Sequence, residues 1–134
     1  MTDYLTVIEV LEIHADQIER YGGAHGLRDP GLLEAALFRP QTGYYEDVID
    51  EAAALWESLA MNHAFVDGNK RVAVATMITF LAINGFAITE EPTPFHRFIV
   101  ENLEAGEFSY ERLVTWLRAN TERIEERHTK DAHD

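Results

Sequence analysis

The sequence predicts an all-α protein: a single compact domain, residues 1–134, folded around a central buried helix. Apolar residues recur at helical spacing along most of the chain, and capping residues, glycines and prolines mark the ends of the helices. The run from Val72 to Ile83 is apolar on all sides but too short to cross a bilayer, so we expect it to be the central helix. With 46% hydrophobic residues, a chain of this length can bury one core.

Two helices are expected before residue 41. The first covers residues 4–20 and ends at Tyr21-Gly22-Gly23, and its stripe at helical spacing is expected to be Leu5, Ile8, Leu11 or Glu12, Ala15 and Ile18. The second begins with Asp29 as N-cap and Pro30 in the first helical position, and Arg39-Pro40 ends it. Residues 41–47 are expected to form a loop. His14 and His25 belong to no ligand cluster, which favours surface or packing roles for both.

The next two helices flank a break in the apolar pattern. One runs from Asp47 to His63, and the four-residue spacing of Leu55, Leu59 and His63 places the imidazole on its inward stripe. The central helix then covers residues 69–83, and Asn84-Gly85 ends it.

The C-terminal part is expected to contain a short extended piece and two further helices. Residues 86–91 are the extended piece, and the following helix begins at Thr93-Pro94 and stops at Gly106. Within it, Phe95, Phe98 and Ile99 either pack in the core or contact a partner helix. Ser109 begins the last helix, and residues 125–134 are expected to form a frayed polar tail. The inward residues of this last helix are expected to be Leu113, Trp116, Leu117 and Ile124.

The net charge of the chain limits the classes of partner that it can bind. The 24 acidic residues outnumber the 11 lysines and arginines, which gives a net charge of −13. Such a surface repels nucleic acid and anionic membranes, so we expect neither as a partner. The absence of cysteine and of an apolar leader fits a cytoplasmic protein.

The segment His63-Ala-Phe-Val-Asp-Gly-Asn-Lys-Arg71 carries the strongest functional signal. It combines an imidazole, a carboxylate, a glycine, an amide and two cations where a helix begins. Backbone N–H groups at a helix N-terminus and fixed positive charge bind phosphates, and a histidine can accept a proton near neutral pH. The pattern therefore predicts a phosphate-handling site with its own base.

Several of these residues have two possible roles. Gly68 allows a sharp turn and close approach of a ligand. Asn69 either caps the central helix or binds a phosphate, and Asp67 either caps the helix or holds Mg²⁺. Lys70 and Arg71 point in different directions and could bind two phosphate groups, although surface salt bridges are the alternative.

The segment from His63 to Arg71 resembles the signature loop of the Fic/Doc superfamily, in its Doc (death-on-curing) toxin version. The resemblance extends to Tyr21-Gly22-Gly23, to the stretch from Gly26 to Pro40, and to Phe80-Leu81 with Asn84-Gly85. It implies a Fic-type helical fold with a helix–loop–helix active site that uses ATP and Mg²⁺. It also implies a type II toxin neutralised by an antitoxin that covers the active-site groove. The implied roles are general base for His63, a site near Mg²⁺ for Asp67, and phosphate binding for Gly68, Asn69, Lys70 and Arg71.

Two departures from the AMP-transferring Fic pattern favour the Doc reaction. AMP-transferring members carry glycine where this chain has Lys70, and a second arginine where it has Val74. The resemblance then implies transfer of the ATP γ-phosphate to a protein hydroxyl, with elongation factor Tu as the class of target. The alternatives are an adenylyltransferase and a non-catalytic member that only binds nucleotide or antitoxin. Thr121 to Glu125 matches the start of the family's self-inhibitory helix motif, but Glu126 departs from it, so we expect a separate inhibitor.

Overall fold

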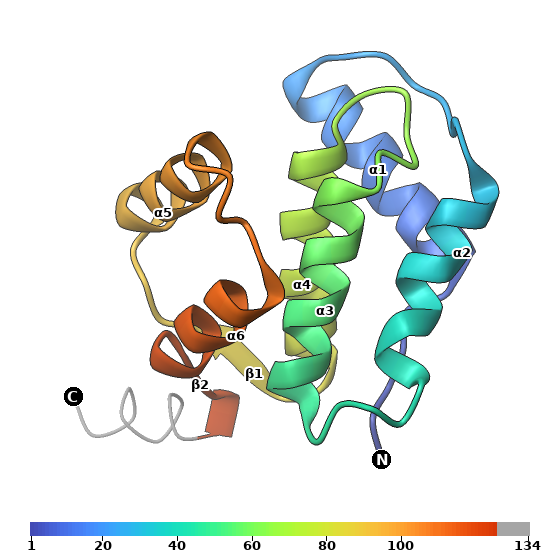
Figure 1. Ribbon diagram of the computed structural model, residues 1–134. Helices are drawn as coiled ribbons and strands as arrows, with labels where there is room; N and C mark the ends of the chain where they lie inside the picture. Colours follow the sequence, from blue (N-terminus) through green and yellow to red (C-terminus); the bar gives the residue numbers. More distant parts are fainter. Residues whose placement is uncertain (126–134) are drawn as a thin grey trace.

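The computed structural model of the protein describes residues 1–125 (Figure 1). In this range the chain is mostly helical, with one short 3₁₀ helix and a two-stranded sheet. The elements are α1 (Val7–Tyr21), α2 (Pro30–Phe38), η1 (Arg39–Gln41), α3 (Val48–Met61), α4 (Asn69–Ile83), β1 (Phe86–Ile88), α5 (Pro92–Glu104), α6 (Tyr110–Ala119) and β2 (Thr121–Arg123).

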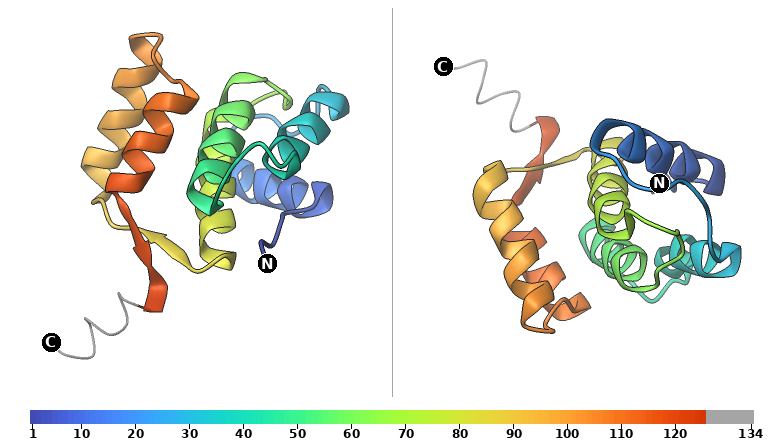
Figure 2. Two further views of the ribbon diagram at one scale, coloured as in Figure 1. Left: turned by 60° about the horizontal axis from the view of Figure 1, so that its bottom comes forward. Right: turned by 90° about the horizontal axis from the view of Figure 1, so that it is seen from above.

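Helices α3 and α4 lie side by side at the centre (Figures 1 and 2). Helix α3 also packs on α2 and α6, and α4 on α1 and β1. Trp56 of α3 is fully buried and contacts the rings of Phe95, Phe108 and Trp116, which joins the two C-terminal helices to the core. Phe95 and Phe98 both stack on Trp116, so of the two roles left open for these aromatic residues the structure shows packing, while Ile99 is half-buried and lines a groove.

The helix buried most completely is α3, not the apolar run that we expected to be central. Every residue from Glu51 to Trp56 is buried, whereas Ile78 and Ile83 of α4 are 40% and 43% exposed. Helix α3 has neighbours on three sides, while one face of α4 borders an open groove.

Side-chain caps explain most of the helix starts. Asp29, Asp47 and Ser109 each accept a hydrogen bond from the backbone of the first turn that follows, as the sequence predicted. Helix α1 begins later than expected, because Thr6 and Glu9 form a reciprocal capping box. Its buried stripe is Val10, His14 and Ile18, and Ile8 is 69% exposed, so the stripe expected to include Ile8 was wrong.

The predicted extended piece at residues 86–91 contains β1, but the predicted last helix ends early. Helix α6 stops at Ala119, and Thr121–Arg123 pairs antiparallel with β1, with Ala87 opposite Glu122. Ile124 is 40% exposed, so its inward placement was wrong. The partial match to a self-inhibitory helix therefore begins in a strand. The predicted tail beyond residue 125 lies outside the described residues. Within residues 1–125, no helix is long and apolar enough to span a membrane.

Candidate active site

The loop of residues 62–68 joins α3 to α4 and lies under a second segment, residues 22–29, which we call the strap (Figure 1). The two are connected through their backbones. The Val66 N–H donates to the Gly26 carbonyl at 3.0 Å, and the Arg28 and Asp29 N–H groups donate to the Ala64 carbonyl at 2.8 and 2.9 Å. These bonds fix the loop against a segment some 40 residues earlier in the chain.

His63 lies beyond the end of α3, which corrects the prediction that it belongs to the helix stripe. The helix ends at Met61, and His63 has a φ of +55°, in the left-handed region. Its side chain is exposed and lines a cavity of about 290 Å³. The same cavity is lined by the other predicted site residues, Asp67, Gly68, Asn69, Lys70 and Arg71, and by Val66. The structure thus brings all six predicted residues together.

Asn69 braces the loop and does not cap α4. Its side-chain oxygen accepts from the Phe65 N–H at 2.9 Å, and its side-chain NH₂ donates to the Phe65 carbonyl at 3.0 Å. The N-cap of α4 is Gly68, in the left-handed region at φ +75°, and no side chain caps the helix. The first-turn N–H groups of α4 therefore have no side-chain cap and are free to bind an anion.

Asp67 ties the strap to the loop. Its Oδ2 accepts from the Ala24 N–H at 3.0 Å and its Oδ1 from the Gly68 N–H at 2.8 Å. These two bonds, in that order, hold the pKa of Asp67 below its ordinary value, and the nearby Arg71 charge adds to the effect. A Cβ at Gly23 would lie only 2.7 Å from Oδ2. Glycine at this position therefore allows the strap to approach Asp67 closely.

The two cations have different surroundings. The Arg71 Nη1 donates to the Gly22 carbonyl at 2.8 Å, so its guanidinium lies against the C-terminal end of α1. Lys70 is exposed, and no hydrogen bond or ion pair engages it within residues 1–125. Neither side chain forms a salt bridge there, in contrast to the alternative left open by the sequence.

His14 is a site residue that sequence reasoning missed. It is 3% exposed, its Nε2 lies 2.7 Å from the Asp67 carbonyl oxygen, and its ring stacks on Phe65. The signal was a polar residue at the centre of an apolar stripe, between Val10 and Ile18. That stripe was assigned to the wrong register, so the signal could not be used.

A larger groove of about 690 Å³ adjoins the cavity and shares Lys70 and Arg71 with it. Its remaining lining is mostly apolar and comes from α1, α4, β1 and α5. Its apolar lining includes Val74, Ile78, Ile88, Phe95 and Ile99.

Carboxylate oxygens are suitable Mg²⁺ ligands, and Asp67 is a carboxylate of the cavity. Within residues 1–125 no group of three or more histidine or acidic side chains is placed to hold a metal ion. A metal ion at Asp67 would therefore need nucleotide phosphates and water for its other ligands.

Comparison with known proteins places this loop and strap in a family. The family model described as "Fic/DOC family" matches residues 4–81, from the N-terminal segment through most of α4. The chain belongs to the Fic/DOC family. This Fic/DOC member is 50% identical over 96 residues to "Toxin Doc" of Mycolicibacterium smegmatis, covering 68% of this chain and 72% of the relative. It is 38% identical over 88 residues to "Protein kinase doc" of Escherichia phage P1, covering 63% and 70% respectively.

Proposed function

We propose that this Fic/DOC protein is a Doc-type toxin kinase of the cytoplasm that transfers the γ-phosphate of ATP to a protein hydroxyl. The names of the two relatives, a toxin and a protein kinase, support this class. The proposal of γ-phosphate transfer, rather than AMP transfer, rests on the face of α4 that borders the groove. Lys70 and Val74 are four residues apart on it, where AMP-transferring members have glycine and arginine.

The proposed chemistry needs one base and several positive groups. His63 accepts the proton of the target hydroxyl, and the freed oxygen attacks the γ-phosphorus. The bond from the γ-phosphorus to the bridging oxygen breaks, and ADP leaves with the electron pair. Lys70, Arg71 and the uncapped first-turn N–H groups, with Gly68 and Asn69 shaping the turn, stabilise the phosphate charge.

The donor set suits a role for Asp67 beside Mg²⁺. We assign it the position nearest the ion because its carboxylate lies in the cavity and its lowered pKa keeps it charged. When bound, Mg²⁺ neutralises charge on the phosphates. Because both oxygens already accept one backbone hydrogen bond, Asp67 could offer the ion only their remaining lone pairs.

The partners follow from the same site. We propose a translation factor such as elongation factor Tu as the phosphorylated protein. We also propose that an antitoxin segment occupies the 690 Å³ groove, since apolar side chains such as Ile78, Ile88 and Ile99 line it next to Lys70. A segment there would lie against the predicted active site and block access to it.

ATP labelled separately at the α and γ positions tests the proposed reaction. Purified protein is added to a bacterial translation extract, with His63→Ala as the matched control. Label that reaches a protein from the γ position only, and only with the wild type, supports the kinase. Label from the α position would contradict it and indicate AMP transfer, and Val74→Arg would then be expected to increase that label. No label from either position would favour a member that only binds nucleotide or antitoxin.

Cell growth gives an independent readout. We expect expression of the wild type to stop growth and His63→Ala to be harmless while binding the antitoxin as before. Toxicity of His63→Ala would show that position 63 does not supply the base.

A further inference from the structure

The backbone of His63 is in a conformation that its side chain disfavours. Among residues 1–125 it is the sole non-glycine residue with positive φ, at +55°. In the left-handed region the Cβ of an L-residue crowds the following carbonyl oxygen, so such residues persist only where the surroundings hold them. The left-handed turn also determines where the imidazole emerges from the chain, which is at the 290 Å³ cavity.

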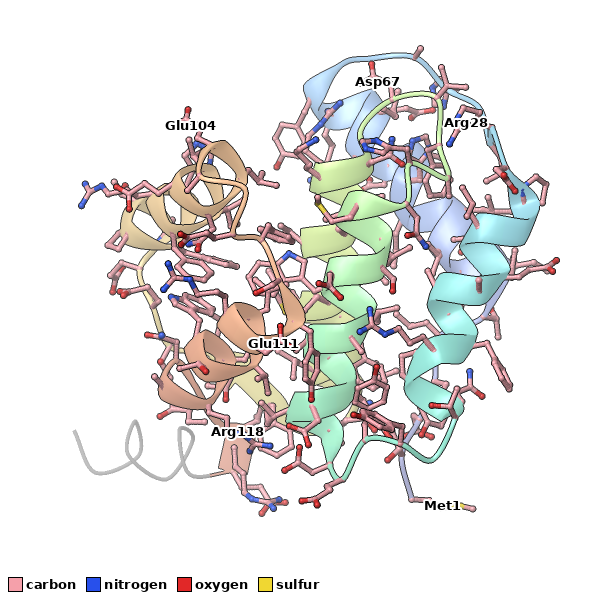
Figure 3. The ribbon with its side chains drawn as sticks, in the orientation of Figure 1. Met1, Arg28, Asp67, Glu104, Glu111 and Arg118 are labelled. Atoms are coloured by element: carbon pink, nitrogen blue, oxygen red, sulfur yellow. The ribbon has the colours of Figure 1, made fainter. Side chains whose placement is uncertain are left out.

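Arg28 of the strap holds this conformation. Its Nε donates to the His63 carbonyl oxygen at 2.8 Å, and its Nη2 donates to the same oxygen. Its backbone N–H donates to the next carbonyl, that of Ala64, at 2.8 Å. One residue thus binds two consecutive carbonyl groups of the loop and restrains the orientation of the two peptide planes that carry them. Figure 3 shows Arg28 reaching this loop from the strap, on the same end of the molecule as Asp67.

In the described part of the chain, the Arg28 guanidinium has no partner that competes with the loop. No carboxylate within residues 1–125 forms an ion pair with it, although the chain carries 24 acidic residues. Its two paired donors are directed at a single carbonyl oxygen. A lysine at this position could supply charge but not two donors in fixed geometry.

We propose that Arg28 is a positioning residue for His63. It touches neither nucleotide nor target, and it acts by keeping residue 63 in the left-handed conformation from which the imidazole faces the cavity. The catalytic part of this inference rests on the proposed function, with His63 as the base. The phosphate-binding residues 68–71 make no hydrogen bond with Arg28, so nucleotide binding is expected to be independent of it.

Kinetics of Arg28→Ala and Arg28→Lys, with Arg112→Ala as the control, test the catalytic part. Arg112 is an exposed arginine of α6 that is ion-paired with Glu107, so its loss removes equal charge far from the loop. We expect Arg28→Ala to lower kcat by roughly 10- to 100-fold, because a small misplacement of a base is costly, with KM for ATP within about twofold. We expect the kcat of Arg28→Lys to lie between those of the wild type and Arg28→Ala, and the kcat of Arg112→Ala to equal that of the wild type. A wild-type kcat in a folded Arg28→Ala variant would overturn the proposal.

Nuclear magnetic resonance of the same variants separates positioning from general damage. The Cα and Cβ shifts and the amide–α-proton coupling of residue 63 report its φ angle. We expect the left-handed signature to be lost in Arg28→Ala, weakened in Arg28→Lys and kept in Arg112→Ala. If Arg28→Ala does not fold, Arg28→Lys decides alone. Unchanged residue 63 signals in a folded Arg28 variant would overturn the proposal, whatever happens to kcat.

This second measurement needs no turnover. If the wild type transferred nothing to any protein, the proposed kinase function would fail. The spectra would still decide whether Arg28 holds residue 63 in place.

Discussion

The Nε2 of His14 lies 2.7 Å from the carbonyl oxygen of Asp67, which connects the buried stripe of α1 to the candidate active-site loop. A carbonyl oxygen can only accept, so Nε2 carries the proton in this contact. The ring also stacks on Phe65, with centroids 3.9 Å apart and planes 9° apart. Helix α1 lies outside the loop, and through His14 it fixes both the loop backbone at Asp67 and the ring of Phe65, which anchors the loop.

Replacing His14 is therefore expected to weaken the fold measurably. His14→Leu removes the donor and leaves the Asp67 carbonyl without it, and it also removes the stacked ring. We expect a loss of about 2–3 kcal/mol in the free energy of unfolding, measured by urea titration. His14→Gln can keep an N–H donor and should lose about half as much. Equal losses in the two variants would show that the hydrogen bond contributes nothing.

Asn69 is expected to be needed for the shape of the loop. Asn69→Ala removes both hydrogen bonds to Phe65 and should cost about 1–3 kcal/mol. Hydrogen exchange of the Phe65 amide should accelerate in the same variant. Asn69→Asp keeps an acceptor for that amide but loses the donor to the carbonyl, so it should be intermediate in exchange. A Phe65 amide as protected as in the wild type would contradict the bracing role.

Lys70 is expected to matter for transfer and not for stability. Because its ammonium has no hydrogen bond or ion pair within residues 1–125, Lys70→Met should leave the melting temperature within about 1 °C of the wild type. Phosphate transfer should fall by about 100-fold or more, since a charge that neutralises the phosphates is lost. Lys130→Met changes the only other lysine of the sequence and is the control. A large drop in melting temperature would show that Lys70 is structural.

Asp67 should make stability depend on acid pH. Its pKa is lowered in the folded state, chiefly by the Ala24 and Gly68 N–H groups, from an ordinary value of 3.8. The stabilisation is therefore complete above that ordinary value and is lost as pH falls through the lower folded-state value. Urea titrations from about pH 6 to about pH 2 should show a shallower acid loss for Asp67→Asn than for the wild type. Parallel curves would contradict this assignment.

Glu51 should have the opposite effect. Its pKa is raised above the ordinary 4.5, chiefly by burial. The hydrogen bond from Tyr4 lowers the pKa and partly opposes this effect, and repulsion from Asp47 and Asp50 raises it further. Among residues 1–125, its Oε2 finds no hydrogen-bond partner. Stability is then lost as pH rises from the unfolded-state value through the raised folded-state value.

Glu51→Gln should consequently raise the melting temperature at neutral pH by a few degrees, an advantage that disappears below about pH 4.5. Glu46→Gln removes the same charge at an exposed position and is the control. A Glu51→Gln variant less stable than the wild type at neutral pH would show that the carboxylate stabilises the fold.

Local signals predicted much of this structure. The caps at Asp29, Asp47 and Ser109 act through bonds within one helical turn, so the helices that follow them could be placed from sequence. The gathering of His63, Asp67 and Lys70 in one cavity followed from their closeness in the chain. The strand at Thr121–Arg123 could not be found in this way, because its partner lies at Phe86–Ile88.

The support for the loop was also hidden from sequence. His14 and Arg28 act on the carbonyl groups of residues 67 and 63. The only trace of the first contact in the sequence is the polar His14 within an apolar stripe, and the Arg28 contact has no signature in spacing or composition. The same holds for the end of α3. The periodicity of the apolar residues predicted that this helix continues to His63. In the structure residue 63 forms a left-handed turn, and its carbonyl accepts hydrogen bonds from Arg28 of the distant strap.

Most of the links between strap and loop use main-chain atoms. The donors are the N–H groups of Ala24, Arg28, Asp29 and Val66, and a substitution by alanine removes none of them. Systematic alanine replacement would therefore pass over much of what holds this site together. Proline, which lacks the N–H, would disrupt it at each of these positions. Apart from Arg28 and the glycines, the strap should tolerate a wide range of side chains and be sensitive to any change that removes a backbone donor.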